Sequence, residues 1–339
     1  MKHMVFYLIM LLSISCSNRQ KELSYQEPVF PIEKHIPAQI LTDTALIAYP
    51  YDLNVDDSYL YLLSLVDGNW LHIYNKHTGE WVCSGIRHGQ GPDEIATGTV
   101  LFLERETESL YIYDSSQSKL LGFSFDKEKK SLSCVSHKSF VEYGGVARTA
   151  WPLTDEHYLV NGQEKGSIGQ LQRFQLYNQE TLVAKYNTTP TADRNNDIAF
   201  ISASQSLSPD KSKLVVGTLW GGILETFRID KRIENISTRY FLPINIQFIK
   251  GTIQPTDQTM YGFTSVQALN DRIWGIWIGD KDPNHNSSIV CFDWDGKEIA
   301  QYHTDNILLK IAQSPEEPNR VYAVAASPEK GFYLVYFDV

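Results

Sequence analysis

The sequence contains few cysteines. Only four of its 339 residues are of this type, and Cys16 stands apart from the others near the N-terminus. The remaining three, Cys83, Cys134 and Cys291, are an odd and widely separated set, which is a poor disulfide framework. Each of them lies in an apolar run, so we expect three buried thiols rather than bridges or metal ligands.

The sequence also lacks a block of basic residues. It has 30 Lys and Arg against 40 Asp and Glu, which gives a formal net charge of −10 at pH 7. Binding to a phosphate backbone needs clustered Lys and Arg side chains. We therefore exclude a nucleic-acid partner.

Sequence signatures of catalysis are missing as well. There is no G-x-S-x-G nucleophile elbow, and none of the nine histidines belongs to an H-E-x-x-H pair. Because a catalytic triad assembles in space, a missing motif leaves open an enzyme with its site at the centre of the fold. A hydrolase or lyase, metal-assisted or not, is thus the alternative to a binding protein. We predict no cofactor.

The N-terminus has the pattern of an export signal. Lys2 is followed by the apolar run Met4–Leu12, which is too short for a membrane span of roughly 20 residues. Two serines lie just before Cys16, as at the cleavage and lipidation site of bacterial lipoproteins. We predict a signal peptide over residues 1–15, a lipidated Cys16 with a flexible tether to residue 27, and one folded domain over residues 28–339. Lipid chains would then hold the protein on a membrane of the cell envelope, on its periplasmic side or outer surface.

The rest of the chain contains a repeated pair of β-rich runs. Tyr59–Leu65 and Trp70–Tyr74 flank a polar turn, as in a hairpin. Similar runs recur about fifty residues apart, which is in the range of a four-stranded propeller blade. The second run of each pair ends at an Asn or Asp, and these ends are Asn75, Asp126, Asn178, Asp230, Asp293 and Asp338. The pattern predicts an all-β fold, a six-bladed β-propeller.

The two ends of the chain complete each other. A further strand follows most of these repeats, but the last one stops at Val339 without it. Pro28–Leu41 predicts a strand that has no repeat of its own. We expect this strand to pair as the outer strand of the last blade and close the ring, which removes open sheet edges. A seventh blade hidden in the longest interval, between Asp230 and Asp293, is the alternative; we assign that interval to long loops.

Two segments resemble a known family. Ser109–Asp126 is similar to an NHL-type blade, and Gly85–Glu94 resembles the G-x-G-P-x-E segment of TolB-like six-bladed propeller lipoproteins of Bacteroidetes. The two glycines, the proline and the final glutamate of that segment match, whereas Asp93 stands where Gly is frequent. The resemblance implies a six-bladed propeller on a lipidated envelope protein, and it implies no settled activity.

The glycine-rich segment is also the first candidate binding site. It joins two blades, and such connections lie on a face where propellers commonly bind ligands. Gly89 and Gly91 permit positive φ and leave their backbone amides accessible, and Arg87 and His88 are suited to an anionic or sugar group. The alternative is a structural latch in which Glu94 accepts backbone hydrogen bonds.

Large aromatic side chains form a second candidate set. Trp151, Trp220, Tyr261 and Trp274 lie near the expected inner strands or face loops. Aromatic surfaces beside amides and carboxylates bind sugars and peptides. Packing of these side chains between blades explains them equally well.

One loop has alternating oxygen ligands. Asp280, Asp282, Asn284 and Asn286 resemble the start of a calcium-binding loop. A histidine replaces the turn glycine, however, and no glutamate closes the site, so a solvated loop is the alternative. Calcium is the one metal that this sequence suggests.

These features favour a binding or scaffold protein of the cell envelope. The export signal places the propeller outside the cytoplasm, and its loop-rich face would take a glycan, a peptide or a protein partner.

Overall fold

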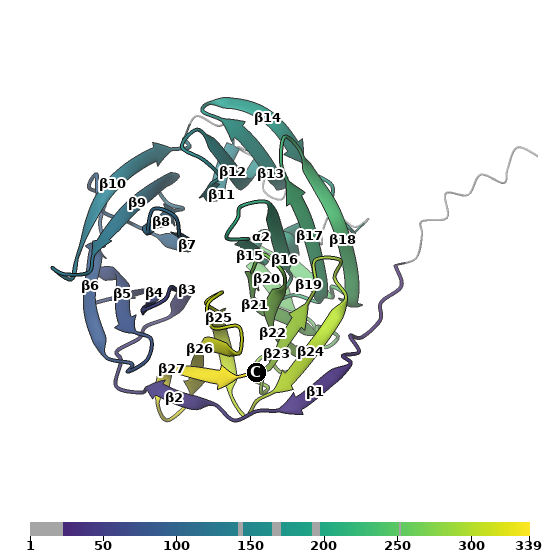
Figure 1. Cartoon of the computed structure of the whole chain (residues 1–339). Coiled ribbons are helices and arrows are strands. Elements are labelled where there is room, and N and C mark those ends of the chain that lie inside the picture. Colours follow the sequence, from purple (N-terminus) through teal and green to yellow (C-terminus); the bar gives the residue numbers. More distant parts are fainter. Residues whose placement is uncertain (1–22, 142–144, 165–170, 192–196, 251) are drawn as a thin grey trace, which may run out of the picture.

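The computed structural model describes residues 23–141, 145–164, 171–191, 197–250 and 252–339. Strands form nearly all of the regular structure, and the helix within this part of the chain is the short α2 (Asp197–Ile201). Six sheets stand side by side around a central opening, as Figure 1 shows. The predicted six blades are therefore confirmed.

Each blade is built outward from the centre by consecutive antiparallel strands. The innermost strands are β3 (Pro50–Val55), β7 (Gly98–Glu104), β11 (Gly145–Pro152), β15 (Ser204–Leu207), β21 (Tyr261–Ala268) and β25 (Ile307–Ala312). The second strands are β4 (Tyr59–Val66), β8 (Ser109–Asp114), β12 (His157–Glu164), β16 (Lys213–Gly217), β22 (Ile273–Asp280) and β26 (Arg320–Ser327). The third strands are β5 (Asn69–Asn75), β9 (Lys119–Asp126), β13 (Leu171–Asn178), β17 (Gly222–Ile229), β23 (Ser288–Phe292) and β27 (Gly331–Asp338). The outer strands are β6 (Trp81–Arg87), β10 (Ser131–Ser139), β14 (Thr181–Tyr186), β18 (Ile233–Leu242), β24 (Glu298–His303) and, in the sixth blade, β2 (Gln39–Thr42).

The repeated runs of the sequence are the second and third strands of these blades. Their central residues are almost all buried and apolar, because both faces of each sheet are covered by the neighbouring blades. The repeated pattern did not include the innermost strands. Several of them carry a charged residue in mid-strand, such as Asp52 in β3 and Lys310 in β25.

The N-terminal segment closes the ring as predicted, but as two strands rather than one. β2 pairs antiparallel with β27, so the first and last parts of the chain share the sixth blade. β1 (Ile32–His35) pairs parallel with β24 and gives the fifth blade a fifth strand. Pro37 lies between the two strands, and its missing N–H and fixed φ suit a break in the ladder. The chain thus crosses from one blade to the next on the outside of the ring (Figure 1).

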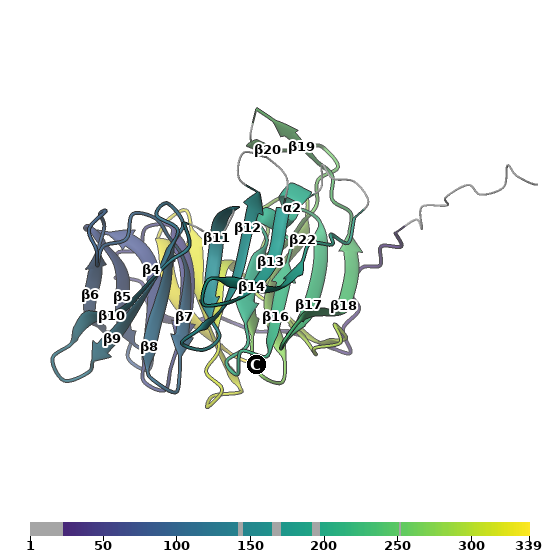
Figure 2. The same ribbon diagram turned by 90° about the horizontal axis from the view of Figure 1, so that it is seen from above.

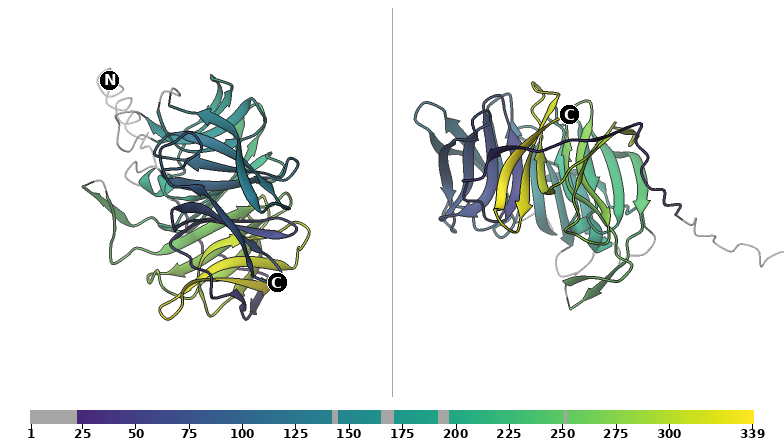
Figure 3. Two further views of the ribbon diagram at one scale, coloured as in Figure 1. Left: turned by 90° about the vertical axis from the view of Figure 1, so that its left-hand side faces the viewer. Right: turned by 90° about the horizontal axis from the view of Figure 1, so that it is seen from below.

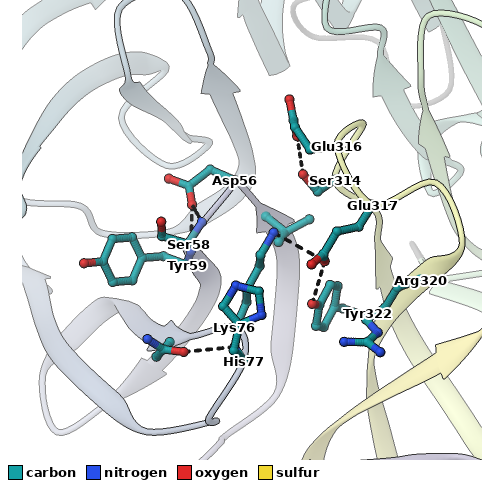
Figure 4. Close-up of polar contacts among 12 residues, drawn as sticks. Asp56, Ser58, Tyr59, Lys76, His77, Ser314, Glu316, Glu317, Arg320 and Tyr322 are labelled. Atoms are coloured by element: carbon teal, nitrogen blue, oxygen red, sulfur yellow. Dashed lines mark hydrogen bonds and ion pairs between the residues drawn. The ribbon is translucent and has the colours of Figure 1, made fainter.

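A polar cluster joins the first and last blades where the ring closes (Figure 4). The ammonium of Lys76, whose side chain is only 2% exposed, lies 3.3 Å from the Glu317 carboxylate. The hydroxyl of Tyr322 donates to the same carboxylate at 2.9 Å. Burial alone would raise the pKa of Glu317, but Tyr322 and Lys76 hold it below its ordinary value. The closure therefore has an ionic contact in addition to the strand pairing.

The longest interval between repeats contains an extra hairpin rather than a seventh blade. β19 (Ile246–Ile249) and β20 (Thr252–Pro255) pair with each other alone and project from one face of the ring (Figures 2 and 3). Helix α2 lies on the same side, which we call the hairpin face (Figure 2). The sequence pattern predicts long loops in this interval, so the hairpin of β19 and β20 differs from that expectation.

The third and fourth blades are joined by a buried ion pair. Arg173 on β13 and Glu225 on β17 are each 1% exposed, and the guanidinium binds the carboxylate with two hydrogen bonds. Arg173 also donates to the carbonyl of Thr188 at 2.7 Å and stacks over the ring of Phe200, 4.9 Å from its centroid. Phe200 belongs to α2, so this one side chain ties two blades and the helix together.

Candidate functional site: the central channel

A channel with a cavity volume of about 290 Å³ runs along the axis of the ring. Residues of all six innermost strands line it, and the chain around α2 contributes at the hairpin face. Inner strands of a propeller converge on the axis, so alternate side chains of every blade point to one place. The channel is thus where the fold brings together residues that are far apart in the sequence.

Two opposite charges face the channel from neighbouring blades. The oxygens of Asp52 accept hydrogen bonds from the backbone amides of Leu53 and Leu101, both at 2.9 Å. Burial raises the pKa of Asp52, although Lys310 and these two amides oppose the rise. Burial likewise lowers the pKa of Lys310, against the attraction of Asp52. Within the described part of the chain, the Lys310 ammonium has no hydrogen bond and no ion pair.

Other polar groups of the channel wall also lack protein partners. The Thr149 hydroxyl and the Gln205 side-chain oxygen are buried and unpaired among the described residues. Ser204 and Ser206 differ, because their hydroxyls accept hydrogen bonds from backbone N–H groups of β21 at 2.9 and 3.0 Å. These bonds link the inner strands β15 and β21. Buried polar atoms without partners are uncommon, and they mark places where a ligand or water completes the hydrogen bonding.

The charge of the lining is positive in an otherwise acidic protein. Arg105, Arg148 and Lys310 contribute cations, and Asp52 is the one carboxylate that lines the described channel. Arg105 is engaged, because it donates to the Val55 carbonyl at 2.8 Å and contacts Glu316 at 3.3 Å. Positive charge in a narrow cavity with low-dielectric walls attracts anions. The channel is therefore suited to an anionic group with hydrogen-bonding capacity.

These channel residues are not among the candidates that the sequence motifs predicted. Asp52, Arg148 and Lys310 each interrupt a run that is otherwise largely apolar, as in ILLKIA for Lys310. A charge in the middle of a buried strand is the signal that could have found them, because such a residue needs a polar surface inside the fold.

The glycine-rich segment has the contacts of a latch. The amide of Gly91 donates to the Glu94 carboxylate at 2.9 Å, and Lys119 donates to the carbonyl of Glu94 at 2.7 Å. Arg87 and His88 are exposed beside it. Neither Gly89 nor Gly91 uses the positive φ that glycine permits, since neither is among the described residues with positive φ. The glycines are needed for space instead, because the Glu94 carboxylate occupies the room that their side chains would take.

This contact makes Gly89→Ala a sensitive change. The added Cβ would lie far inside van der Waals contact with a Glu94 carboxylate oxygen, so the Glu94 side chain has to move away and give up its hydrogen bond from the Gly91 amide. We expect a loss of about 1–3 kcal/mol in the free energy of unfolding, the usual contribution of a hydrogen bond to a charged group. Urea denaturation measures it, and in a Glu94→Ala background the same change should have a smaller effect. Equal losses in the two backgrounds would contradict the latch.

The four aromatic candidates do not form one surface. Trp151 and Trp274 are 1% and 2% exposed, and the indole of Trp274 donates to the Gln313 side chain at 2.7 Å. Trp220 and Tyr261 do lie together, with ring centroids 5.3 Å apart. Tyr261 begins β21, and α2 packs in the same apolar cluster as Trp220. A binding role for this pair stays a prediction.

The alternating acidic segment begins at Asp280, the half-buried last residue of β22, and residues 281–286 after it are exposed. The Asp280 carboxylate accepts a hydrogen bond from the backbone amide of Asp282, and the Asp282 carboxylate accepts one from the amide of Asn284, both at 2.9 Å. The side chains of Asn284 and Asn286 lie in the same exposed loop. These are contacts of successive tight turns, and calcium binding here stays a prediction.

The predicted signal peptide and Cys16 lie outside the described residues. Part of the expected tether is described, and it contacts the fourth blade. The amide of Gln26 donates to the Tyr240 carbonyl at 2.9 Å, and the rings of Tyr25 and Tyr240 meet edge to face. Within the described chain, no helix is long and apolar enough to span a membrane.

The ring of six blades around a polar channel defines the class of this protein, a six-bladed β-propeller. A family model described as TolB-like 6-blade propeller-like matches residues 30–314. The chain therefore belongs to the TolB-like six-bladed propeller family, and the predicted resemblance is confirmed.

Solved structures show the same fold at low sequence identity. A protein of Bacteroides fragilis that is named as exported is 13% identical, with a TM-score of 0.55 over 90% of this chain and 98% of that one. Regucalcin of Agrobacterium tumefaciens, named as calcium-binding, is 13% identical with a TM-score of 0.52 over 90% and 95%. A gluconolactonase of Xanthomonas campestris is 10% identical with a TM-score of 0.50 over 88% and 89%. At these identities the likeness shows the fold alone, and no curated protein matches the sequence.

Proposed function

We propose that this protein is a non-enzymatic binding protein of the cell envelope, and that its central channel takes the carboxylate of an acidic glycan or peptide. The unpaired Lys310 ammonium in the channel wall carries the proposal. A half-buried cation without a hydrogen-bonding partner is unfavourable unless an anion or water completes its shell.

The surroundings of Lys310 support an anionic ligand. The nearest opposite charge in the lining is Asp52, whose two oxygens already accept backbone amides. Burial lowers the pKa of Lys310, and a bound carboxylate would reverse this effect by favouring the charged form. Thr149 and Gln205 add a hydroxyl and an amide oxygen that suit the hydroxyl groups of a sugar or the amides of a peptide.

The envelope location rests on the N-terminus. The predicted export signal and Cys16 would tether the propeller to a membrane. Tyr25 and Gln26 contact Tyr240 in the fourth blade, which supports an attachment on that side of the ring. The name of the Bacteroides fragilis structure as an exported protein agrees with this proposal.

The channel does not favour the metal-assisted hydrolase or lyase. Its described lining offers one carboxylate, Asp52, and no His or Cys side chain. Metal-dependent hydrolysis uses several carboxylate or imidazole ligands that converge on one point. We therefore do not propose this alternative.

Thermal melting with matched ligands tests the proposed class of ligand. We expect uronic-acid oligosaccharides, or short peptides with a free C-terminus, to raise the melting temperature, and their neutral or amidated counterparts to have no effect. A ligand at 100 times its Kd adds about 2.7 kcal/mol to the free energy of unfolding. The glycan and peptide arms distinguish the source of the carboxylate. Equal shifts for charged and neutral ligands, or none with either, would contradict the proposal.

A further inference from the structure

Three side chains with metal-binding atoms converge outside the channel. The Nε2 atom of His137 lies 3.2 Å from the Cys134 sulfur and 3.0 Å from an Asp93 oxygen. All three ligand atoms lie within 4.8 Å of one another. Among the described residues this is the one group of three His, Cys, Asp or Glu side chains with such spacing.

The fold assembles this group from two segments. Asp93 belongs to the latch between the first and second blades, and Cys134 and His137 belong to β10, the outer strand of the second blade. Residues three apart in a regular strand point to opposite faces. A β-bulge between Cys134 and Ser136 breaks this alternation and lets the His137 ring reach the cysteine. Cys134 is half-buried beside a histidine, which corrects the expectation of a buried thiol.

The geometry does not suit a catalytic triad. In a triad the histidine contacts the nucleophile through one ring nitrogen and the acid through the other. Here Cys134 and Asp93 both contact Nε2. Three possible ligand atoms that lie close around one point are instead the arrangement of a metal site.

We propose that Asp93, Cys134 and His137 form a zinc site that fastens the latch segment to the outer strand of the second blade. One thiolate, one imidazole and one carboxylate are the borderline ligands that Zn²⁺ accepts, whereas Ca²⁺ and Mg²⁺ prefer oxygen alone. Zinc would displace the thiol proton of Cys134 and form one bond to each of the three ligand atoms.

The fourth position of the metal would be open. Zinc sites with three protein ligands keep one position for water or a ligand. Asp93 and Cys134 line an open groove of about 770 Å³, which also contains Arg87 and Glu94. The zinc site is thus accessible from solvent and lies at the rim of the ring, separate from the channel.

Metal binding to the purified full-length protein in a Cys16→Ser background tests the site, because this change removes the thiol of the predicted lipidation site. We expect one zinc ion per chain after dialysis. Cobalt should replace it and give a thiolate-to-cobalt charge-transfer band, which Cys134→Ser abolishes. Each of Asp93→Asn, Cys134→Ser and His137→Ala should weaken zinc binding at least about tenfold, the lower end of what even outer-shell changes cause.

A matched control uses the exposed loop after β22. Asp282→Asn and His285→Ala remove a carboxylate and an imidazole from a solvent-exposed position, and zinc affinity should be unchanged. Melting curves without metal show whether each variant folds. Unchanged zinc affinity in folded Cys134→Ser and His137→Ala, or a cobalt spectrum without the thiolate band, would overturn the proposal.

Discussion

Arg173→Met alone should destabilise the protein by about 3–5 kcal/mol, because it leaves the Glu225 carboxylate buried without a partner. The side chains of both residues are 1% exposed, so water cannot replace the lost hydrogen bonds. The guanidinium also stacks over Phe200 and Phe227, 4.9 and 5.6 Å from their centroids. The change therefore loosens α2 together with the junction of the third and fourth blades.

Equilibrium unfolding in urea measures this loss. Two further variants show whether the unpaired charge causes it. Arg173→Met combined with Glu225→Leu removes both charges and should be clearly more stable than Arg173→Met alone, because no buried charge stays unpaired. Arg320→Met breaks the more exposed pair with Asp338 and should change stability by about 0–1 kcal/mol. A double variant as unstable as the single one would show that packing, not the unpaired charge, dominates.

Removing the chain up to Thr42 should open the ring. This truncation deletes β1 and β2 and leaves β24 and β27 with open edges. It also removes Phe30, which is 5% exposed and packs edge to face on Phe292. Loss of one such buried aromatic costs about 3–5 kcal/mol by itself, and open strand edges promote association.

A second truncation is the control for ring closure. A chain that begins at Leu23 keeps both strands, Phe30 and the Tyr25–Tyr240 contact, so it should melt like the full chain. Light scattering and melting curves compare the two chains at equal concentration. A truncated chain from Asp43 onward that stays monomeric and equally stable would contradict the proposed closure.

The sequence allowed the blades to be counted because the second and third strands are buried on both faces. Runs such as YLYLLSLV in β4 are apolar enough to stand out, and each third strand meets a polar turn. The innermost strands lacked this signal, since Asp52 and Lys310 interrupt them. Ring closure was predictable from the unpaired first strand. The division of that strand into β1 and β2 was not, because it depends on the strands that each part meets, β24 before Pro37 and β27 after it.

The candidate sites were harder to predict, because they depend on contacts between distant segments. Lys310 approaches Asp52 only when the sixth blade meets the first across the closed ring. Cys134 and His137 share one side of β10 only because of a β-bulge, and Asp93 joins them from another blade. The charges of Asp52 and Lys310 in the middle of apolar strands are visible in the sequence, but the sequence has no local pattern that shows which distant residues meet. The glycine-rich latch is the opposite case, because its residues contact one another within a few positions.

Calorimetric titration of the carboxylate ligand found by melting tests the role of Lys310 most directly. The ligand is titrated into the wild-type protein, Lys310→Met and the exposed control Lys281→Met. Removing one partner of a desolvated charged hydrogen bond costs about 2 kcal/mol or more, so Lys310→Met should raise Kd at least tenfold. Lys281→Met should bind like the wild type. A folded Lys310→Met protein with unchanged affinity would contradict the account of the channel as the binding site.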